Sequence, residues 1–161
     1  MTPYSFLMRR IVSLLLFVTL GVATHIHAQS AHTPKPGSPE RQAICDAARE
    51  HVLQKYATER LPQAIVFHID HIAVQDGYCF FEATPRFKDG RFVPPNYLPD
   101  MAYNLCLKSE ARGWTVILDL SRSDVPDASE IASIKEKLPS DFPFAVFSPD
   151  WRKILQGAIA P

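Results

Sequence analysis

The stretch that decides the fold is AIVFHIDHIAVQDGYCFFEATPRFK, residues 64–88. Two segments rich in β-branched and aromatic residues, 64–75 and 78–88, lie on either side of Asp76-Gly77. An Asp-Gly pair between such segments is a strong hairpin signal, because both turn residues of the preferred turn take positive φ. The sequence therefore predicts an antiparallel hairpin.

The apolar residues of the first strand do not alternate strictly. They are Phe67, Ile69, Ile72 and Val74. Strict alternation would place the first two and the last two on opposite faces, whereas a β-bulge at Asp70-His71 would return all four to one face. Three residues of the second strand would share that face: Cys79, Phe81 and Ala83.

A helix is predicted before this hairpin and a second hairpin after it. Ser38-Pro39-Glu40 is typical of a helix start, and an apolar stripe at helical spacing follows until Pro62 ends it. The second hairpin pairs residues 101–108 with residues 114–120 through a polar turn. A proline-rich connection, residues 89–100, joins the two hairpins.

The C-terminal third predicts a short helical tail. Asp127 with Glu130 is typical of a capping box, the apolar segment 141–147 should lie along the domain, and Ser148-Pro149 begins a last helical turn. The predicted fold class is α+β, with an N-terminal helix packed on a four-stranded antiparallel meander. A helix across a curved sheet resembles the cone of cystatin-like and NTF2-like domains.

The N-terminal region predicts export. Arg9 and Arg10 precede an uncharged apolar run, residues 11–23, which is too short for a membrane span and suits a secretory signal. We expect residues 1–28 to be removed, with cleavage after Ala28 preferred to Ala23, so that no stable membrane anchor remains and the protein is periplasmic or secreted. Residues 29–38 are expected to form a flexible tether and residues 39–161 a single domain.

The charge balance disfavours nucleic acid as a partner. The chain has 17 basic and 17 acidic residues, and it loses two arginines with the predicted signal. A near-neutral domain has no long-range field to attract a polyanion.

The order of segments resembles a family of small exported bacterial proteins. That family has an F-x-V-x-x-L-x-V strand, a G-W-A-F strand, a leucine-rich strand, a G-x-W-x-V strand and a T-D-V turn. The corresponding segments here are FHIDHIAVQDGYCFFEA, YNLCLKSEARGWTVI and SRSDV, within residues 40–126. The matching positions are Phe67, Ile69, Ile72, Val74, Gly77, Phe80, Leu105, Leu107, Trp114, Val116, Asp124 and Val125. The resemblance implies a fold and no activity, and this chain departs from the pattern at Tyr78-Cys79 and Cys106.

Three cysteines remain after the predicted cleavage: Cys45, Cys79 and Cys106. An oxidising compartment favours one disulfide and one free thiol. A Cys79–Cys106 bond is the preferred pairing, because a meander places their strands side by side. Cys45 could reach Cys79 instead, and three buried free thiols are the remaining alternative.

No catalytic residue, metal site or cofactor is predicted. His68, Asp70 and His71 suggest a metal site, but neighbours on a strand point in opposite directions and cannot converge easily. His71 is instead expected to face Glu82 across the hairpin. Asp119, Arg122 and Asp124 follow the last strand and are interpreted as a salt-linked turn.

Two binding functions are predicted in place of an enzyme. The first is a protein-binding role, such as an inhibitor or immunity factor, through the residues Arg86, Phe87, Arg91, Phe92 and Tyr97. These aromatic residues could instead fold back over one end of the sheet. The second is an apolar-ligand carrier with a pocket between helix and sheet, lined by Phe67, Phe81, Tyr103 and Trp114. These four could instead simply fill the core.

Overall fold

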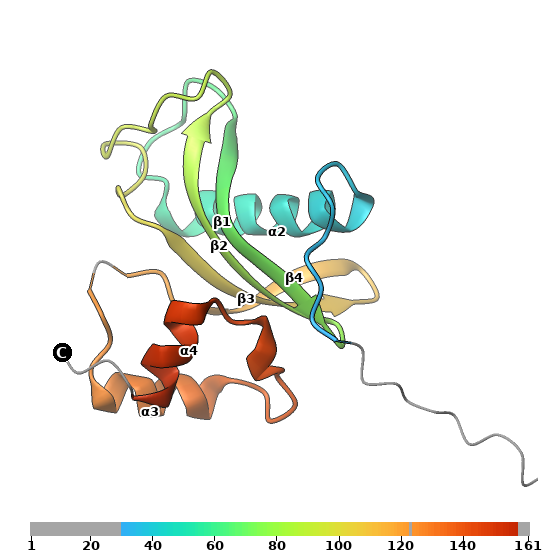
Figure 1. The fold of residues 1–161 in the computed structure, drawn as a ribbon. Helices are drawn as coiled ribbons and strands as arrows, with labels where there is room; N and C mark the ends of the chain where they lie inside the picture. Colours follow the sequence, from blue (N-terminus) through green and yellow to red (C-terminus); the bar gives the residue numbers. More distant parts are fainter. Residues whose placement is uncertain (1–29, 123, 158–161) are drawn as a thin grey trace, which may run out of the picture.

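The structure is a computed structural model that describes residues 30–122 and 124–157. The predicted signal peptide and its cleavage points lie outside the described residues. Figure 1 shows the elements in chain order. They are α2 (Pro39–Tyr56), β1 (Ile65–Gln75), β2 (Tyr78–Phe87), β3 (Tyr103–Glu110), β4 (Gly113–Asp119), α3 (Ala128–Lys137), the 3₁₀ turn η1 (Phe144–Val146) and α4 (Pro149–Gln156).

The four strands form an antiparallel meander in the order β1-β2-β3-β4, which confirms the predicted α+β class. The first hairpin turns at Asp76 and Gly77, whose φ angles are 50° and 78°. Both lie in the left-handed region that the Asp-Gly pair was expected to occupy. The hairpin prediction is therefore confirmed down to its turn residues.

A β-bulge lies where the apolar pattern of β1 predicted it. Ile69 faces Ala83 and His71 faces Glu82, so Asp70 is the extra residue. Beyond the bulge, Ile72 and Val74 return to the same face as Phe67 and Ile69. The bulge exists because the apolar side chains can share one core only if the strand skips a residue.

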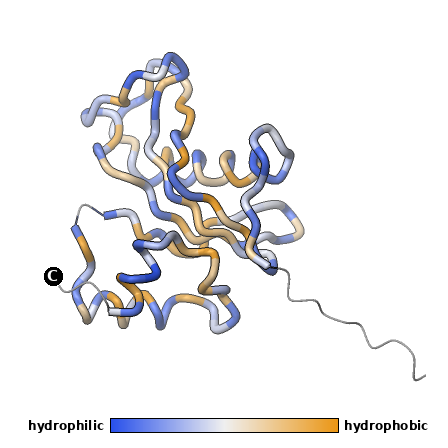
Figure 2. The backbone as a smooth tube through the Cα atoms, in the orientation of Figure 1, coloured by the Kyte–Doolittle hydropathy of each residue, from blue (hydrophilic) through white to orange (hydrophobic). Residues whose placement is uncertain are grey.

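Two cores lie on opposite faces of the sheet, so the fold has three layers. The helix-facing core is formed by α2 and one face of the sheet, with Ile44, Ala48 and Val52 of the helix fully buried. The tail-facing core is formed by the other face and the C-terminal segment. Its residues include Phe80, Cys106, Leu120, Val146, Phe147, Trp151 and Leu155. Figure 2 shows the hydrophobic colouring concentrated on the strands between these two layers.

The C-terminal segment is folded as its capping residues predicted. Asp127 and Glu130 form a complete capping box at α3, and the Ser148 side chain accepts a hydrogen bond from the backbone N–H of Trp151 at α4. The rings of Phe147 and Phe80 pack against each other at a tilt of 50°, with 4.8 Å between ring centres. The tail is therefore a full packing layer of the domain.

The expectation of a flexible tether is wrong for part of residues 29–38. His32 forms an isolated antiparallel bridge with Val74, with N···O distances of 2.9 and 2.8 Å, and Pro34 is buried. The physical reason is that β1 is an edge strand whose outward backbone groups accept a partner.

In the described part of the chain no helix is both long and apolar enough to cross a bilayer.

Candidate functional site

The connection after β2 holds an arginine and a phenylalanine in a stack. Arg86 and Phe92 form an isolated β-bridge, and the guanidinium carbon of Arg86 lies 3.1 Å from the centre of the Phe92 ring. A guanidinium over an aromatic face is favourable. The Phe92 residue is nevertheless 61% exposed, so the stack presents an ordered aromatic side chain to solvent.

A second arginine lies beside this stack. The guanidinium of Arg91 is 5.9 Å from the Phe87 ring and pairs with Asp89 at 2.8 Å. Hydrogen bonds from Arg91 lower the pKa of the Asp89 carboxyl. Because both charges are exposed, this pair orients the arginine more than it stabilises the fold. We call Arg86, Arg91 and Phe92 the arginine–aromatic surface.

The rest of the connection anchors this surface to the domain. Val93 and Leu98 are buried in the helix-facing core, and Tyr97 packs against that core. Phe87 is only 4% exposed. Of the five residues predicted to contact a partner, Phe87 and Tyr97 therefore fold back over the sheet, and the other three form the exposed surface.

The four residues predicted to line a pocket come together in the helix-facing core. Phe81 and Tyr103 are fully buried, and the rings of Phe67 and Phe81 meet edge to face at 5.1 Å. Phe67 and Trp114 border two separate surface hollows. The hollow at Trp114 lies between α2 and β4 and has a volume of about 250 Å³, but Phe67, Phe81 and Tyr103 do not line it. The interior between helix and sheet is filled by side chains, so the four residues do not enclose one shared pocket.

A buried carboxylate connects α2 to the end of β4. Oδ2 of Asp119 lies 2.8 Å from His51 Nε2, 2.9 Å from Lys55 Nζ and 3.0 Å from the Tyr56 hydroxyl. The other oxygen, Oδ1, accepts a hydrogen bond from the backbone N–H of Ser121 at 2.9 Å. The Asp119 side chain is only 6% exposed.

The electrostatics of this cluster favour the ionised carboxylate. Burial by itself would raise the pKa of Asp119, but hydrogen bonds from Lys55, Ser121 and His51 outweigh burial and hold the pKa at about 2. The expectation that Asp119 belongs to a salt-linked turn with Arg122 is wrong. Arg122 pairs with Glu130 at the start of α3 instead.

A second bulge explains why Asp119 faces α2. Leu107 faces Val116 and Cys106 faces Leu118, so Ile117 is the extra residue of β4. Val116 packs on the helix-facing core, whereas Leu118 packs on the tail-facing core. After the bulge, the side chain at position 119 points towards the helix.

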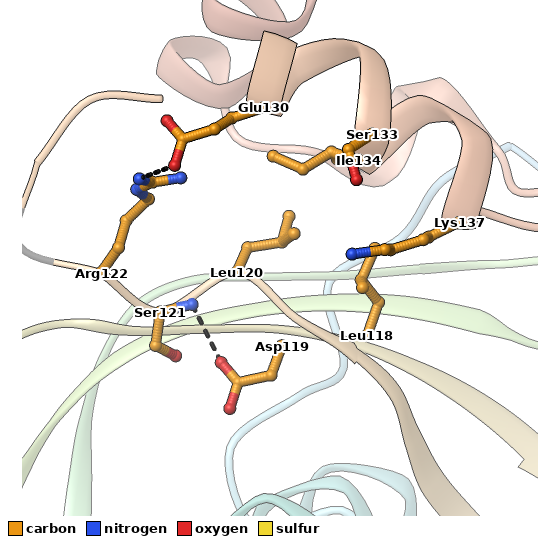
Figure 3. A pocket seen from close by; sticks show the side chains of 9 residues that line it. All are labelled: Leu118, Asp119, Leu120, Ser121, Arg122, Glu130, Ser133, Ile134 and Lys137. Carbon is orange, nitrogen blue, oxygen red and sulfur yellow. Dashed lines mark hydrogen bonds and ion pairs between the residues drawn. The ribbon is translucent and has the colours of Figure 1, made fainter. Parts of the chain in front are cut away.

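A hollow lies between the end of β4 and α3 (Figure 3). Its apolar floor consists of Leu118, Leu120 and Ile134, and polar groups from both elements surround the floor. The polar side chains at the hollow are those of Arg122, Glu130, Ser133 and Lys137, whereas the Asp119 and Ser121 side chains point away from α3 (Figure 3). No sequence pattern predicted this hollow, because it depends on how α3 packs against a strand edge.

The predicted Cys79–Cys106 disulfide is wrong, since all three cysteines are free. Cys79 faces Leu107 and Cys106 faces Phe80, so one residue of register separates the two thiols and places them on opposite faces. Burial raises the pKa of both thiols, and that of the half-buried Cys45 as well. The thiols are therefore protonated and packed as small apolar groups.

The histidines of β1 are separated by the bulge. His71 faces Glu82, as predicted, and its Nε2 lies 2.8 Å from the carbonyl oxygen of Val146. His68 is exposed, 3.6 Å from Asp70. Within residues 30–122 and 124–157, no group of three or more His, Cys, Asp or Glu side chains is arranged to hold a metal ion.

No protein-family profile matches the chain, and no curated protein or solved structure shows significant similarity to it. The resemblance to small exported bacterial proteins therefore stays a prediction from the sequence.

Proposed function

We propose that this chain is a non-enzymatic binding protein whose protein partner docks on the arginine–aromatic surface. The observation that carries the proposal is Phe92, a 61% exposed aromatic side chain held under a guanidinium at 3.1 Å. Exposed aromatic and arginine side chains are the residues that dominate binding energy at protein interfaces. We further propose, from the predicted signal, that binding occurs in the periplasm or outside the cell.

The surface is pre-organised for binding. Its backbone is tied to β2 by the Arg86–Phe92 bridge, and Val93 and Leu98 fix the following segment in the core. Pro94, Pro95 and Pro99 lie in the same connection. A side chain that is already ordered loses less conformational entropy when a partner binds, so more of its contact energy appears as affinity.

The charge of the surface indicates an acidic partner. Arg86, Lys88 and Arg91 lie within six residues of one another, and only Asp89 opposes them. Such a surface would attract carboxylate groups and repel a basic protein. Binding should consequently weaken as the salt concentration rises, because exposed charges are screened.

Site-specific photocrosslinking tests this function. A photoreactive phenylalanine derivative replaces Phe92 in the full chain, expressed in the organism of origin. Phe144 is the matched control, because it is another exposed phenylalanine, at 42%, in the C-terminal layer. We expect a protein adduct from position 92 that disappears with Arg86→Ala, and none from position 144.

The outcome is informative in either direction. Circular dichroism should show the same folded spectrum for each variant, because neither side chain belongs to a core. Equal adducts from both positions, or adducts from position 144 alone, would remove the arginine–aromatic surface as the docking site. An adduct that survives Arg86→Ala would show that the stack is not what presents the ring.

A further inference from the structure

The two edges of the sheet differ in how well they are covered. At β1, His32 pairs with Val74, Arg49 donates a hydrogen bond to the carbonyl oxygen of Ile65, and a bulge interrupts the strand at Asp70. Such devices protect an edge from pairing with another chain. At β4, no segment of the described residues pairs with the outer edge.

The outward backbone groups of β4 can be identified from the ladder. Gly113 and Glu110 close the turn between β3 and β4, so they form a hydrogen-bonded pair. The next pair, Ser109 and Trp114, is consequently a non-hydrogen-bonded pair, so the backbone groups of each residue point away from the other strand. In agreement, the Ser109 N–H donates to the carbonyl oxygen of Gly77, on the side of β3 away from β4. The N–H and C=O groups of Trp114 and Val116 therefore point away from the sheet.

The hollow of Figure 3 lies at the end of the same strand and carries unpaired cationic and hydroxyl groups. Within the described residues, the Lys137 side chain has no ion pair, the Ser133 hydroxyl has no hydrogen bond, and the buried Nε of Arg122 has no acceptor. The Asp119 and Glu130 carboxylates are already bound, to α2 and to Arg122. What remains free in the hollow is a set of donors.

We propose that β4 is a docking edge for an extended peptide segment of a partner protein, with an acidic side chain of that peptide entering the hollow beside Lys137. The open edge selects an extended backbone, because only a strand can satisfy the outward groups of Trp114 and Val116. The free donors select a carboxylate. The hollow has a volume of about 380 Å³, which accommodates one such side chain over its apolar floor.

This edge is a second surface, independent of the arginine–aromatic surface. Its residues come from β4, the segment directly after β4, and α3, whereas Arg86 and Phe92 belong to β2 and the connection after it. Substitutions at one surface should leave the other unaffected. The proposal can therefore fail while the proposed function stands, and the reverse also holds.

The first experiment selects short random peptides displayed on phage against the full chain. We expect selected peptides to have Asp or Glu at one fixed position, and Lys137→Glu to weaken their binding by about tenfold or more. Lys135→Glu is the matched control, because Lys135 is an exposed lysine of the same helix outside the hollow. Selected peptides with no fixed acidic position would overturn the proposal. So would an equal loss of peptide affinity with Lys137→Glu and Lys135→Glu.

The second experiment tests the strand pairing itself. A selected peptide is synthesised with single N-methyl groups at successive residues, which removes one backbone donor at a time. We expect the loss of affinity to alternate with a period of two, because only every second residue of a strand faces its neighbour. Equal affinity for all of the N-methylated peptides would overturn the proposal. So would sedimentation of the chain as a dimer that Val116→Pro dissociates, since a second copy would then occupy the edge.

Discussion

Replacing Asp119 by Asn should destabilise the fold through the loss of one charge. The side chain is 6% exposed and accepts hydrogen bonds from His51, Lys55 and Tyr56 through one oxygen. A fall in pKa from 3.8 to about 2 corresponds to roughly 2.5 kcal/mol of unfolding free energy, at about 1.4 kcal/mol per pKa unit. We expect the Asn variant to lose about that amount at pH 7.

The pH dependence has a defined sign. The pKa of Asp119 is lower in the folded state, so its contribution is fully present above the ordinary value of 3.8 and is lost as the pH falls to about 2. Wild-type and Asn proteins should therefore differ in stability at pH 7 and converge near pH 2. Urea unfolding followed by tryptophan fluorescence measures this, since Trp114 and Trp151 lie in different cores.

Asp89→Asn is the matched control for this prediction. Asp89 also has a lowered pKa, chiefly through hydrogen bonds from Arg91, but it is exposed and its ion pair with Arg91 lies on the surface. We expect its replacement to leave the unfolding free energy unchanged within error. A constant difference between wild type and Asp119→Asn from pH 7 to pH 2 would refute the assignment of the stabilisation to the ionised carboxylate.

Three further predictions concern the cores and the first turn. Ellman's reagent should titrate three thiols in urea but react readily only with Cys45 in the folded protein, and a missing thiol in urea would indicate a Cys79–Cys106 or other disulfide. Gly77→Ala should cost about 1 kcal/mol in urea unfolding, because φ is 78° while the nearest atom, 4.0 Å away, leaves room for the methyl group; an unchanged midpoint would contradict the turn conformation. Phe80→Ala should cost about 3–5 kcal/mol, since the ring is fully buried under the C-terminal layer, and a cost below about 1 kcal/mol would show that this layer is not docked.

The local features of the fold were predictable because short-range patterns determine them. The Asp76-Gly77 turn, the bulge at Asp70 and the capping box at Asp127 each follow from residues within a few positions of one another. The position of the tail was not predictable in the same way. Its apolar segment indicated burial, but only the unpaired apolar face of β2 around Phe80 determines where it packs.

The errors at the candidate site share one cause, which is strand register. A Cys79–Cys106 disulfide requires the two side chains to lie on the same face of the sheet. In the structure Cys79 faces Leu107, the neighbour of Cys106, so the two thiols lie on opposite faces. The Asp119 cluster joins residues more than sixty positions apart. One signal was present, because His51 and Lys55 are spaced four residues apart and so share a helix face that an acidic strand residue could meet.

Deletion of residues at the bulge tests whether Ile117 sets the direction of the Asp119 side chain. Removing Ile117 should leave Cys106 facing Leu118, and Asp119 should still face α2, because the bulge is the one place where β4 holds a residue without a partner of its own. We expect the deletion variant to fold, to lose only the partial burial of Ile117, about 1–2 kcal/mol, and to keep the Asp119 pKa near 2 by NMR titration.

Removing Leu118 as well should have the opposite effect. Asp119 would then take the place opposite Cys106 and point into the tail-facing core, where the contacts of its carboxylate with His51 and Lys55 are lost. An unpaired buried carboxylate is among the costliest changes a small domain can suffer, so the double deletion should unfold the chain. If the single deletion unfolds the protein as completely as the double one, the bulge is required for the twist of the sheet and does not serve to orient Asp119.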